Sequence, residues 1–144
     1  MVLCDVNVLV YAYSATAEDH EAYRDWLRSL LESPSVFGYS EVVLASFVRV
    51  TTNPRILAPP ATVEQAFAFA GAIRDRPNAV PIHPSRRHWE IFRSLCHAAN
   101  ARGPLVADAH LAALAIESGS EWVTTDRDYS RFPGLRWRHP LFPA

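Results

Sequence analysis

Short apolar runs alternate with longer helical stretches along this chain, and this alternation is what most constrains its fold. Apolar runs at 2–4, 36–39, 80–82 and 121–125 are separated by segments with the three-to-four spacing of a buried helix face. Because two-residue hairpin turns do not join these runs, crossover helices must connect them, which favours parallel pairing. The pattern predicts an α/β fold: a three-layer α/β/α sandwich around a mainly parallel central sheet of four to five strands.

Helix boundaries follow from capping residues, prolines and apolar spacing. One helix should bury Tyr23, Leu27 and Leu30, and a second should open at Glu41 and end near Asn53-Pro54. Further helices are expected after the Thr62 cap (Val63, Phe67, Ala70 and Ile73 inward), over 85–101 (Trp89, Phe92, Cys96 and Ala99 inward) and over 106–118, with a last edge strand at 135–137. Phe69 falls off its helix stripe and is expected at an interface.

Composition favours one domain over 1–144, because 144 residues with 49% hydrophobic side chains suffice for a single core. The opening segment is too quickly interrupted by charge for a signal peptide, and the apolar runs are too short to span a membrane. We therefore expect a soluble cytoplasmic protein.

The two cysteines lack a C-x-x-C spacing and are expected as core thiols. Lysine is absent from the sequence, which excludes Walker-type phosphate loops and Schiff-base chemistry.

Four acidic residues, Asp5, Glu41, Asp108 and Asp126, stand where an apolar run gives way to a turn or a helix start. Singly, each has an ordinary role as a helix cap, a first-turn acid or a turn former. A parallel sheet, however, would gather them at the carboxyl edge of its strands, where such folds bind ligands. Clustered carboxylates repel one another unless a cation neutralises them, and oxygen-only ligands suit Mg²⁺ or Mn²⁺.

Four segments carry a resemblance to a known family: Cys4-Asp5-Val6-Asn7-Val8-Leu9, Ser40-Glu41-Val42, Val106-Ala107-Asp108-Ala109-His110-Leu111-Ala112-Ala113 and Thr124-Thr125-Asp126-Arg127-Asp128-Tyr129. In order, spacing and overall length the chain resembles PIN-domain ribonucleases, and more narrowly the VapC-type toxins of bacterial toxin–antitoxin pairs. Asn7 is a departure, since many relatives carry serine or threonine there; its amide still offers a supporting hydrogen bond.

The resemblance implies a type II toxin that hydrolyses RNA to a 5′-phosphate and a 3′-hydroxyl with Mg²⁺, for which Mn²⁺ could substitute. General metal chemistry gives the same mechanism, in which the ion lowers the pKa of a bound water and offsets transition-state charge. Asp5 and Asp108 are the expected direct ligands, Asp126 completes the metal site, and Glu41 orients or deprotonates the water. Asn7, Thr124 and Asp128 are expected to support these four catalytic side chains. The implied partners are an RNA substrate, a small VapB-like antitoxin that inhibits the enzyme, and a second copy in a homodimer, with no membrane contact.

The sequence leaves two other functional classes of protein open. The opening Asp5-Val6-Asn7-Val8 is similar to the nucleophile motif of haloacid-dehalogenase-like phosphatases, although Asn7 cannot act as the second acid. A non-catalytic PIN-like binding module would keep the fold without the chemistry, and the intact set of four acids argues against it. Incubation with RNA and with a phosphomonoester, with and without Mg²⁺, separates these classes.

Overall fold

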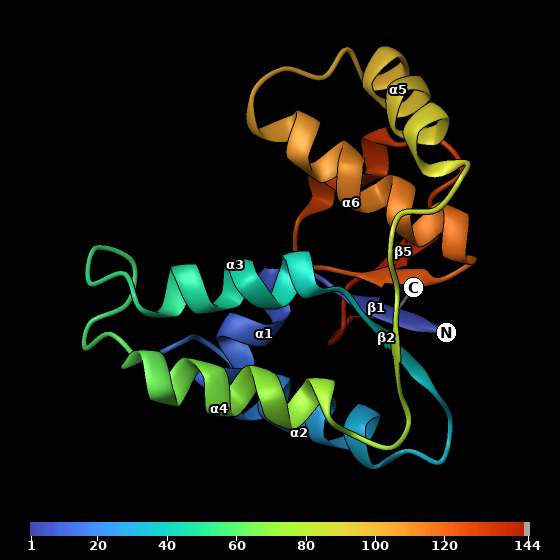
Figure 1. Cartoon of the computed structure of the whole chain (residues 1–144). Helices are drawn as coiled ribbons and strands as arrows, with labels where there is room; N and C mark the ends of the chain where they lie inside the picture. Colours follow the sequence, from blue (N-terminus) through green and yellow to red (C-terminus); the bar gives the residue numbers. More distant parts are fainter. Residues whose placement is uncertain (143–144) are drawn as a thin grey trace.

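The computed structural model describes residues 1–142 and shows strands alternating with helices along the chain (Figure 1). The elements in chain order are β1 (Val2–Cys4), α1 (Val6–Tyr13), α2 (His20–Glu32), β2 (Phe37–Tyr39), α3 (Glu41–Thr51), α4 (Val63–Arg74), β3 (Ala79–Pro81), α5 (His88–Ala99), α6 (Pro104–Ser118), β4 (Glu121–Val123), the 3₁₀ helix η1 (Arg127–Arg131) and β5 (Trp137–Arg138). None of the helices in 1–142 is both long and apolar enough to cross a bilayer.

The strands pair only in parallel within 1–142, as the crossover helices require. Three of them form one sheet in the order β1-β4-β5, with Leu3 opposite Trp122 and Trp122 opposite Trp137. The other two, β2 and β3, form a second parallel pair. The three-stranded sheet and the two-stranded pair pack together where the Leu3 side chain of β1 lies against Gly38 of β2. The carboxyl ends of β1, β4 and β5 therefore lie at one edge of their sheet.

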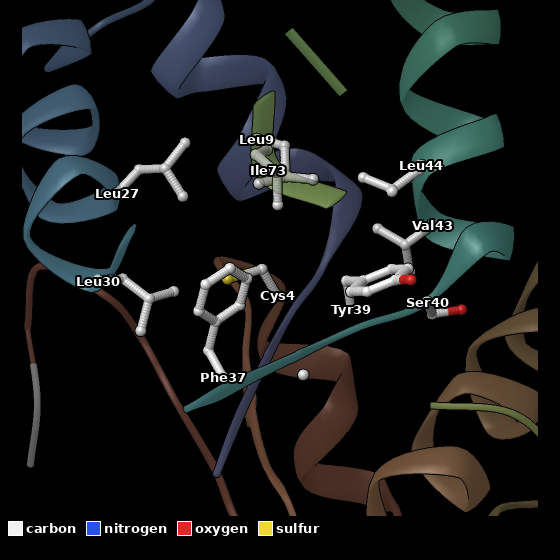
Figure 2. A pocket seen from close by; sticks show the side chains of 11 residues that line it. Cys4, Leu9, Leu27, Leu30, Phe37, Tyr39, Ser40, Val43, Leu44 and Ile73 are labelled. Atoms are coloured by element: carbon white, nitrogen blue, oxygen red, sulfur yellow. The ribbon is translucent and has the colours of Figure 1, made fainter. Parts of the chain in front are cut away.

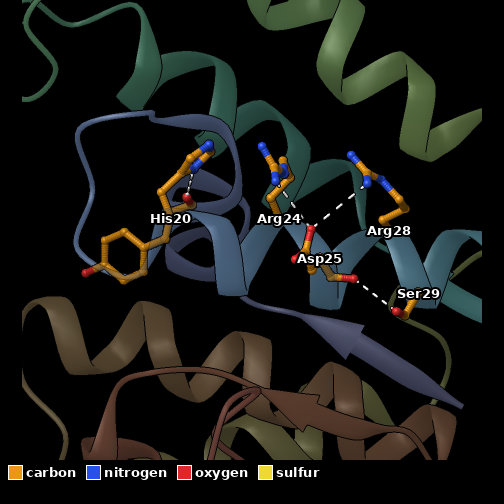
Figure 3. Close-up of polar contacts among 6 residues, drawn as sticks. His20, Arg24, Asp25, Arg28 and Ser29 are labelled. Atoms are coloured by element: carbon orange, nitrogen blue, oxygen red, sulfur yellow. Dashed lines mark hydrogen bonds and ion pairs between the residues drawn. The ribbon is translucent and has the colours of Figure 1, made fainter.

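Helices cover the strands on both sides and make the expected three-layer sandwich. Figure 1 shows α5 and α6 on one side of the strands and α1 to α4 on the other. The alanine-rich face of α6, with Ala109, Ala112 and Ala113 fully buried, packs close to β4 because small side chains permit a short approach. The outer face of α2 is polar and solvated. There Asp25 lies near Arg24 (3.5 Å) and Arg28 (4.0 Å), exposed ion pairs that add little stability (Figure 3).

Local sequence signals start and stop several helices. Thr62 and Gln65 form a reciprocal capping box at the start of α4, as the Thr62 cap predicts. Gly119 ends α6 in the left-handed conformation that glycine adopts most easily. Asp5 caps α1 by accepting the Val6 N–H.

The inward faces of two helices differ from the expected ones. In α4 the buried positions are Ala66, Ala70 and Ile73, while Phe67 is 61% exposed. Phe69, expected at an interface, instead stacks on Phe47 with ring centroids 4.9 Å apart. In α5, His88, Leu95 and Ala99 are buried while Trp89 is 67% exposed. In both helices the buried face is rotated away from the exposed aromatic residue, so Ala66 in α4 and Leu95 in α5 face inward instead. The last strand is Trp137–Arg138, about one to two residues later than expected.

A small cavity of about 20 Å³ lies under β1 and β2, with Cys4 and Phe37 among the side chains that line it (Figure 2). Burial, with a further contribution from the charge of Asp5, raises the pKa of the Cys4 thiol to about 12. The thiol therefore stays protonated and unreactive, as expected of a core cysteine. Cys4 and Cys96 are both free thiols.

The contact between β1 and β2 yields a stability prediction. A Cβ at Gly38 would lie 2.9 Å from both Leu3 Cδ2 and Ile82 Cγ1, so Gly38→Ala must displace packed side chains. We expect a loss of about 1–3 kcal/mol in the free energy of unfolding, measured by urea denaturation. Gly71→Ala in α4 is the matched control, because its nearest contact would be 3.8 Å away and alanine favours helix by about 0.5–1 kcal/mol. Equal stability of the two variants would contradict this packing.

Candidate active site

Asp5 lies at the carboxyl end of β1, where the strand turns directly into α1. Its side chain is buried, with 4% exposure, yet it accepts three hydrogen bonds. The Val6 N–H and the Thr124 hydroxyl each donate at 2.7 Å, and the Asn7 amide donates at 3.0 Å. These donors hold the carboxylate in one orientation at the sheet edge, and they support its charged form in a buried place.

Thr124 and Asn7 connect β1 to the segment that follows β4. The Asn7 amide also donates to Thr124 Oγ1 (3.3 Å), and its carbonyl oxygen accepts the Thr125 N–H (3.2 Å). Thr124 Oγ1 accepts the Asp126 N–H at 3.0 Å. Both residues were predicted to support the acidic side chains, and these hydrogen bonds are consistent with that role.

The turn after β4 brings Asp126, Asp128 and Tyr129 to the same edge. Asp126 Oδ1 accepts the Asp128 N–H at 2.8 Å and so begins η1. The Tyr129 hydroxyl donates to Asp108 Oδ1 on α6 at 3.3 Å, and its ring is almost fully buried. Sequence reasoning did not assign Tyr129 a role. Its position directly after the Asp126-Arg127-Asp128 turn was the available signal, but its partner on α6 is visible only in the fold.

The carboxylates of Asp5, Asp108 and Asp126 interact electrostatically. Burial is the largest cause that raises the pKa of Asp5, to about 6, and the charges of Asp108 and Asp126 add to it against the lowering hydrogen bonds from Thr124 and Val6. The pKa of Asp108 is likewise raised, first by burial and then by Asp126 and Asp128, while the Tyr129 hydroxyl opposes the shift. The charge of Asp126 therefore disfavours the charged forms of Asp5 and Asp108, and the charge of Asp108 disfavours that of Asp5.

Glu41 does not join these three in the conformation seen. It is the first residue of α3, at the end of β2, and its side chain is 56% exposed. The carboxylate pairs with the Arg74 guanidinium of α4 at 3.1 Å, and Arg74 also contacts Asp75 and lies over the Tyr39 ring. The structure therefore brings together three of the four predicted acids, and it places the Glu41 carboxylate on Arg74 instead. Arg74 lies 33 positions further along the chain, so only the fold reveals this pair.

The residues present suit a hard cation that keeps most of its water. Within 1–142, no three His, Cys, Asp or Glu side chains are arranged to hold a single ion as they stand. Mg²⁺ needs fewer, since it commonly binds one or two carboxylates and retains several waters. Asp5 and Asp108 offer those oxygens. Burial first, and then the charges of neighbouring acids, raise the pKa of both carboxyls, so a cation would stabilise their charged forms. The donor set therefore fits a hydrated Mg²⁺ or Mn²⁺ and not zinc.

Comparison with known proteins places this arrangement in a family. Residues 2–135 match the family model of the PIN domain. Ribonuclease VapC43 of Mycobacterium tuberculosis is 43% identical over 141 residues, which cover 98% of this chain and 96% of that protein. Ribonuclease VapC25 of the same organism is 40% identical, with 97% of this chain and 99% of that protein covered. The structure of VapBC2 from Rickettsia felis, bound to a promoter DNA fragment, matches with a TM-score of 0.69 at 19% identity, covering 96% of this chain and 98% of that chain.

The chain belongs to the PIN domain family and, within it, to the VapC ribonucleases. The resemblance carried by the four sequence motifs is thereby confirmed, as is the predicted fold.

The burial of Asp5 predicts a pH-dependent stability. Its pKa is 3.8 in the unfolded chain and about 6 when folded, so the cost of its charge to folding grows from about pH 4 and is fully present above about pH 6. As the pH falls through 6 the folded state takes up a proton first, and this cost declines. In the absence of metal we expect Asp5 to contribute a gain on the order of 1 kcal/mol in unfolding free energy between about pH 7.5 and 5.

Urea denaturation of wild type and Asp5→Asn in chelator across this range measures the contribution. The stability of Asp5→Asn relative to wild type should be greatest at the higher pH and should shrink as the pH falls. Asp25→Asn, on the exposed face of α2, is the control and should follow wild type at every pH. A constant difference between wild type and Asp5→Asn would refute the shifted pKa.

Proposed function

We propose that this chain is the toxin of a type II toxin–antitoxin system and hydrolyses RNA phosphodiester bonds with the help of Mg²⁺. The observation that carries the proposal is the gathering of Asp5, Asp108 and Asp126 at the carboxyl edge of the parallel sheet, where the charge of Asp126 raises the pKa of both other carboxyls. Support comes from the curated relatives, which are named ribonucleases at up to 43% identity over nearly the whole chain. VapC ribonucleases with a PIN domain are generally metal-dependent, and Mg²⁺ is the ion that this donor set favours, with Mn²⁺ as a substitute.

Each side chain has a part in the proposed reaction. Asp5 and Asp108 would hold the ion directly, and Asp126 would complete the acidic site. When bound, the ion lowers the pKa of a coordinated water and offsets negative charge that develops on the phosphate. Thr124, Asn7 and Tyr129 keep the carboxylates oriented through the hydrogen bonds described above. The products are a 5′-phosphate and a 3′-hydroxyl.

Glu41 takes the role of orienting or deprotonating the attacking water. For this its carboxylate must leave Arg74, with which it shares an ion pair that is about half exposed on both sides. Ion pairs of this kind contribute only about 0–1 kcal/mol, so the exchange costs little. Arg74 is then free to turn toward solvent or toward Asp75, its other acidic contact at 3.3 Å.

Charge-neutral substitutions test these roles. We expect Asp5→Asn, Asp108→Asn and Glu41→Gln each to lower the rate of RNA cleavage in Mg²⁺ by at least tenfold, or about 1.4 kcal/mol of barrier, with the fold intact by circular dichroism. Cleavage of end-labelled RNA, with and without chelator, measures the rate, and analysis of the new ends checks the products.

Asp75→Asn is the matched control for Glu41→Gln, because both remove one acidic partner of Arg74 and only Glu41 lies at the end of β2. It should cleave at the wild-type rate. Losses below tenfold in the first three variants, or an equal loss in Asp75→Asn, would overturn the assigned roles. Cleavage of a phosphomonoester instead of RNA would point to the phosphatase class, and cleavage of neither to a binding module.

We further propose a small VapB-like antitoxin as inhibitor, a homodimer as the working form, and the cytoplasm as the site of action. The support for the antitoxin is that the Rickettsia felis neighbour is described as VapBC2. The exposed Phe67, and not the packed Phe69, is the aromatic of α4 that such contacts can use. Co-expression with the upstream reading frame should yield a complex in which RNA cleavage is suppressed, and light scattering of the toxin alone should give twice the chain mass. A monomer at high concentration, with full activity in the presence of the neighbouring gene product, would contradict both.

A further inference from the structure

A second cavity, of about 390 Å³, opens beside the acidic site at the carboxyl end of β5. It is lined by Arg127, Ser130, Trp137, Arg138, His139 and Phe142. Its volume lies in the range of small-molecule sites, and its walls combine guanidinium groups with aromatic rings. None of these residues belongs to the catalytic set proposed above.

The cavity and the acidic site share one edge of the sheet. Arg127 directly follows Asp126 in the chain and opens η1. On the β5 side, the Thr124 N–H donates to the Arg138 carbonyl oxygen at 3.1 Å, and the same Thr124 donates its hydroxyl to Asp5. Because β4 and β5 are parallel neighbours, His139 leaves β5 where Thr124 leaves β4. A polymer lying across the acidic site can therefore reach this cavity without a large detour.

Arg127 and Arg138, the two arginines of the cavity, differ in the contacts that their guanidinium groups make with other side chains. The Arg138 guanidinium pairs with Glu121 at 2.7 Å and lies over the Trp26 ring at 5.8 Å, so it forms a fixed wall. Arg127 is exposed and makes no side-chain hydrogen bond or ion pair with another residue between 1 and 142. An uncommitted guanidinium next to an acidic metal site is suited to a phosphate group, which it can bind through two parallel hydrogen bonds.

His139, one half of the aromatic wall, is held by contacts on both ring nitrogens. His139 Nδ1 accepts the Leu141 N–H at 3.1 Å, and its Nε2 lies 3.4 Å from the Tyr23 hydroxyl. The His139 and Phe142 rings lie 4.8 Å apart at 34°, and Phe142 is 72% exposed. Two neighbouring aromatic faces that are open on one side form a stacking platform of the kind on which unpaired bases bind. Burial, followed by the charge of Arg127, lowers the pKa of His139, so its ring is neutral near pH 7.

We propose that this cavity binds one nucleotide of the RNA substrate next to the scissile phosphate, with its base stacked on His139 and Phe142 and a backbone phosphate held by Arg127. The proposal rests on the proposed function, because it takes its polymer from the reaction at Asp5 and Asp108. Single-stranded RNA is the occupant that fits, since it repeats a planar base and an anion at every step and is the polymer of the proposed reaction. The protein therefore prefers unpaired nucleotides, because a base within a double helix must leave the stack before it can reach the His139 and Phe142 rings.

Equilibrium binding tests the proposal with two variants whose effects should differ in kind. The probe is a fluorescein-labelled RNA of twelve nucleotides with randomised sequence, titrated with the full chain in chelator and followed by fluorescence anisotropy at several salt concentrations. Phe142→Ala should weaken binding roughly 5- to 150-fold, the range of a lost base–aromatic stack, without changing the salt dependence. Arg127→Gln should weaken binding and lower the slope of log affinity against log salt by about 0.7, the value of one phosphate contact on a single strand.

Matched controls come from residues that do not line this cavity. Arg86→Gln makes the same charge change beside Glu117 and Ser118, and Trp89→Ala removes an exposed aromatic of α5. Both should bind the probe as wild type does. Wild-type affinity in Arg127→Gln and Phe142→Ala, equal losses in the controls, or no binding by wild type would overturn the proposal. Losses confined to antitoxin binding would assign the cavity to a protein partner and overturn it as well.

The nucleotide site and the proposed RNA-cleaving activity can be tested separately. A protein that binds the probe through Arg127 and Phe142 but never cuts RNA in Mg²⁺ would retain this nucleotide site and lose the proposed function. A protein that cuts RNA while both variants bind normally would lose only the nucleotide site. In an active protein the variants should also raise KM with little change in kcat, because the site binds a part of the substrate that does not react.

Discussion

The buried carboxylate of Asp5, held by the Thr124 hydroxyl, is the contact on which the rest of the site depends. It joins the start of the chain to a residue 119 positions later at a distance of 2.7 Å. The same hydroxyl orients the backbone of Asp126, and the backbone of Thr124 pairs with β5. One threonine thus fixes the acidic site on one side and the aromatic cavity on the other. A buried carboxylate with three donors is costly to displace, so Asp5 keeps its orientation at this edge of the sheet.

The buried charge of the acidic site lowers the stability of the folded protein near neutral pH. Burial raises the pKa of Asp5 to about 6, so near neutral pH the folded protein holds a charge that water would solvate better. The hydrogen bonds from Thr124 and Val6 offset only part of this cost. Asp108 and Asp126 add repulsion across the turn. A site that is destabilised by its own charges is poised for a cation, because binding returns free energy that folding alone could not recover.

Two arginines near the carboxyl edge of the sheet differ in their contacts. Arg74 forms ion pairs with Glu41 and Asp75, whereas Arg127 lines the cavity next to Asp126. In a chain with a formal net charge of −1 and no lysine, such local placement of guanidinium groups has to provide any attraction for RNA. The carboxyl edge therefore combines a negative pocket suited to a cation with a flanking cationic and aromatic surface suited to a nucleotide. These two halves are complementary, since cleavage requires both a metal and a positioned phosphate.

The sequence by itself determined the layer order, the parallel pairing and the placement of Asp5, Asp108 and Asp126 at one edge. These features follow from local periodicity and from the rule that parallel strands end together, and neither needs long-range detail. Only the tertiary structure decided which way the side chains turn. Glu41 pairs with Arg74, Tyr129 reaches Asp108, Phe67 faces outward while Phe69 packs inward, and His139 meets Tyr23. Each of these depends on contacts between residues distant in sequence and on packing that selects among nearly equivalent helix faces, and a local pattern holds no information about either.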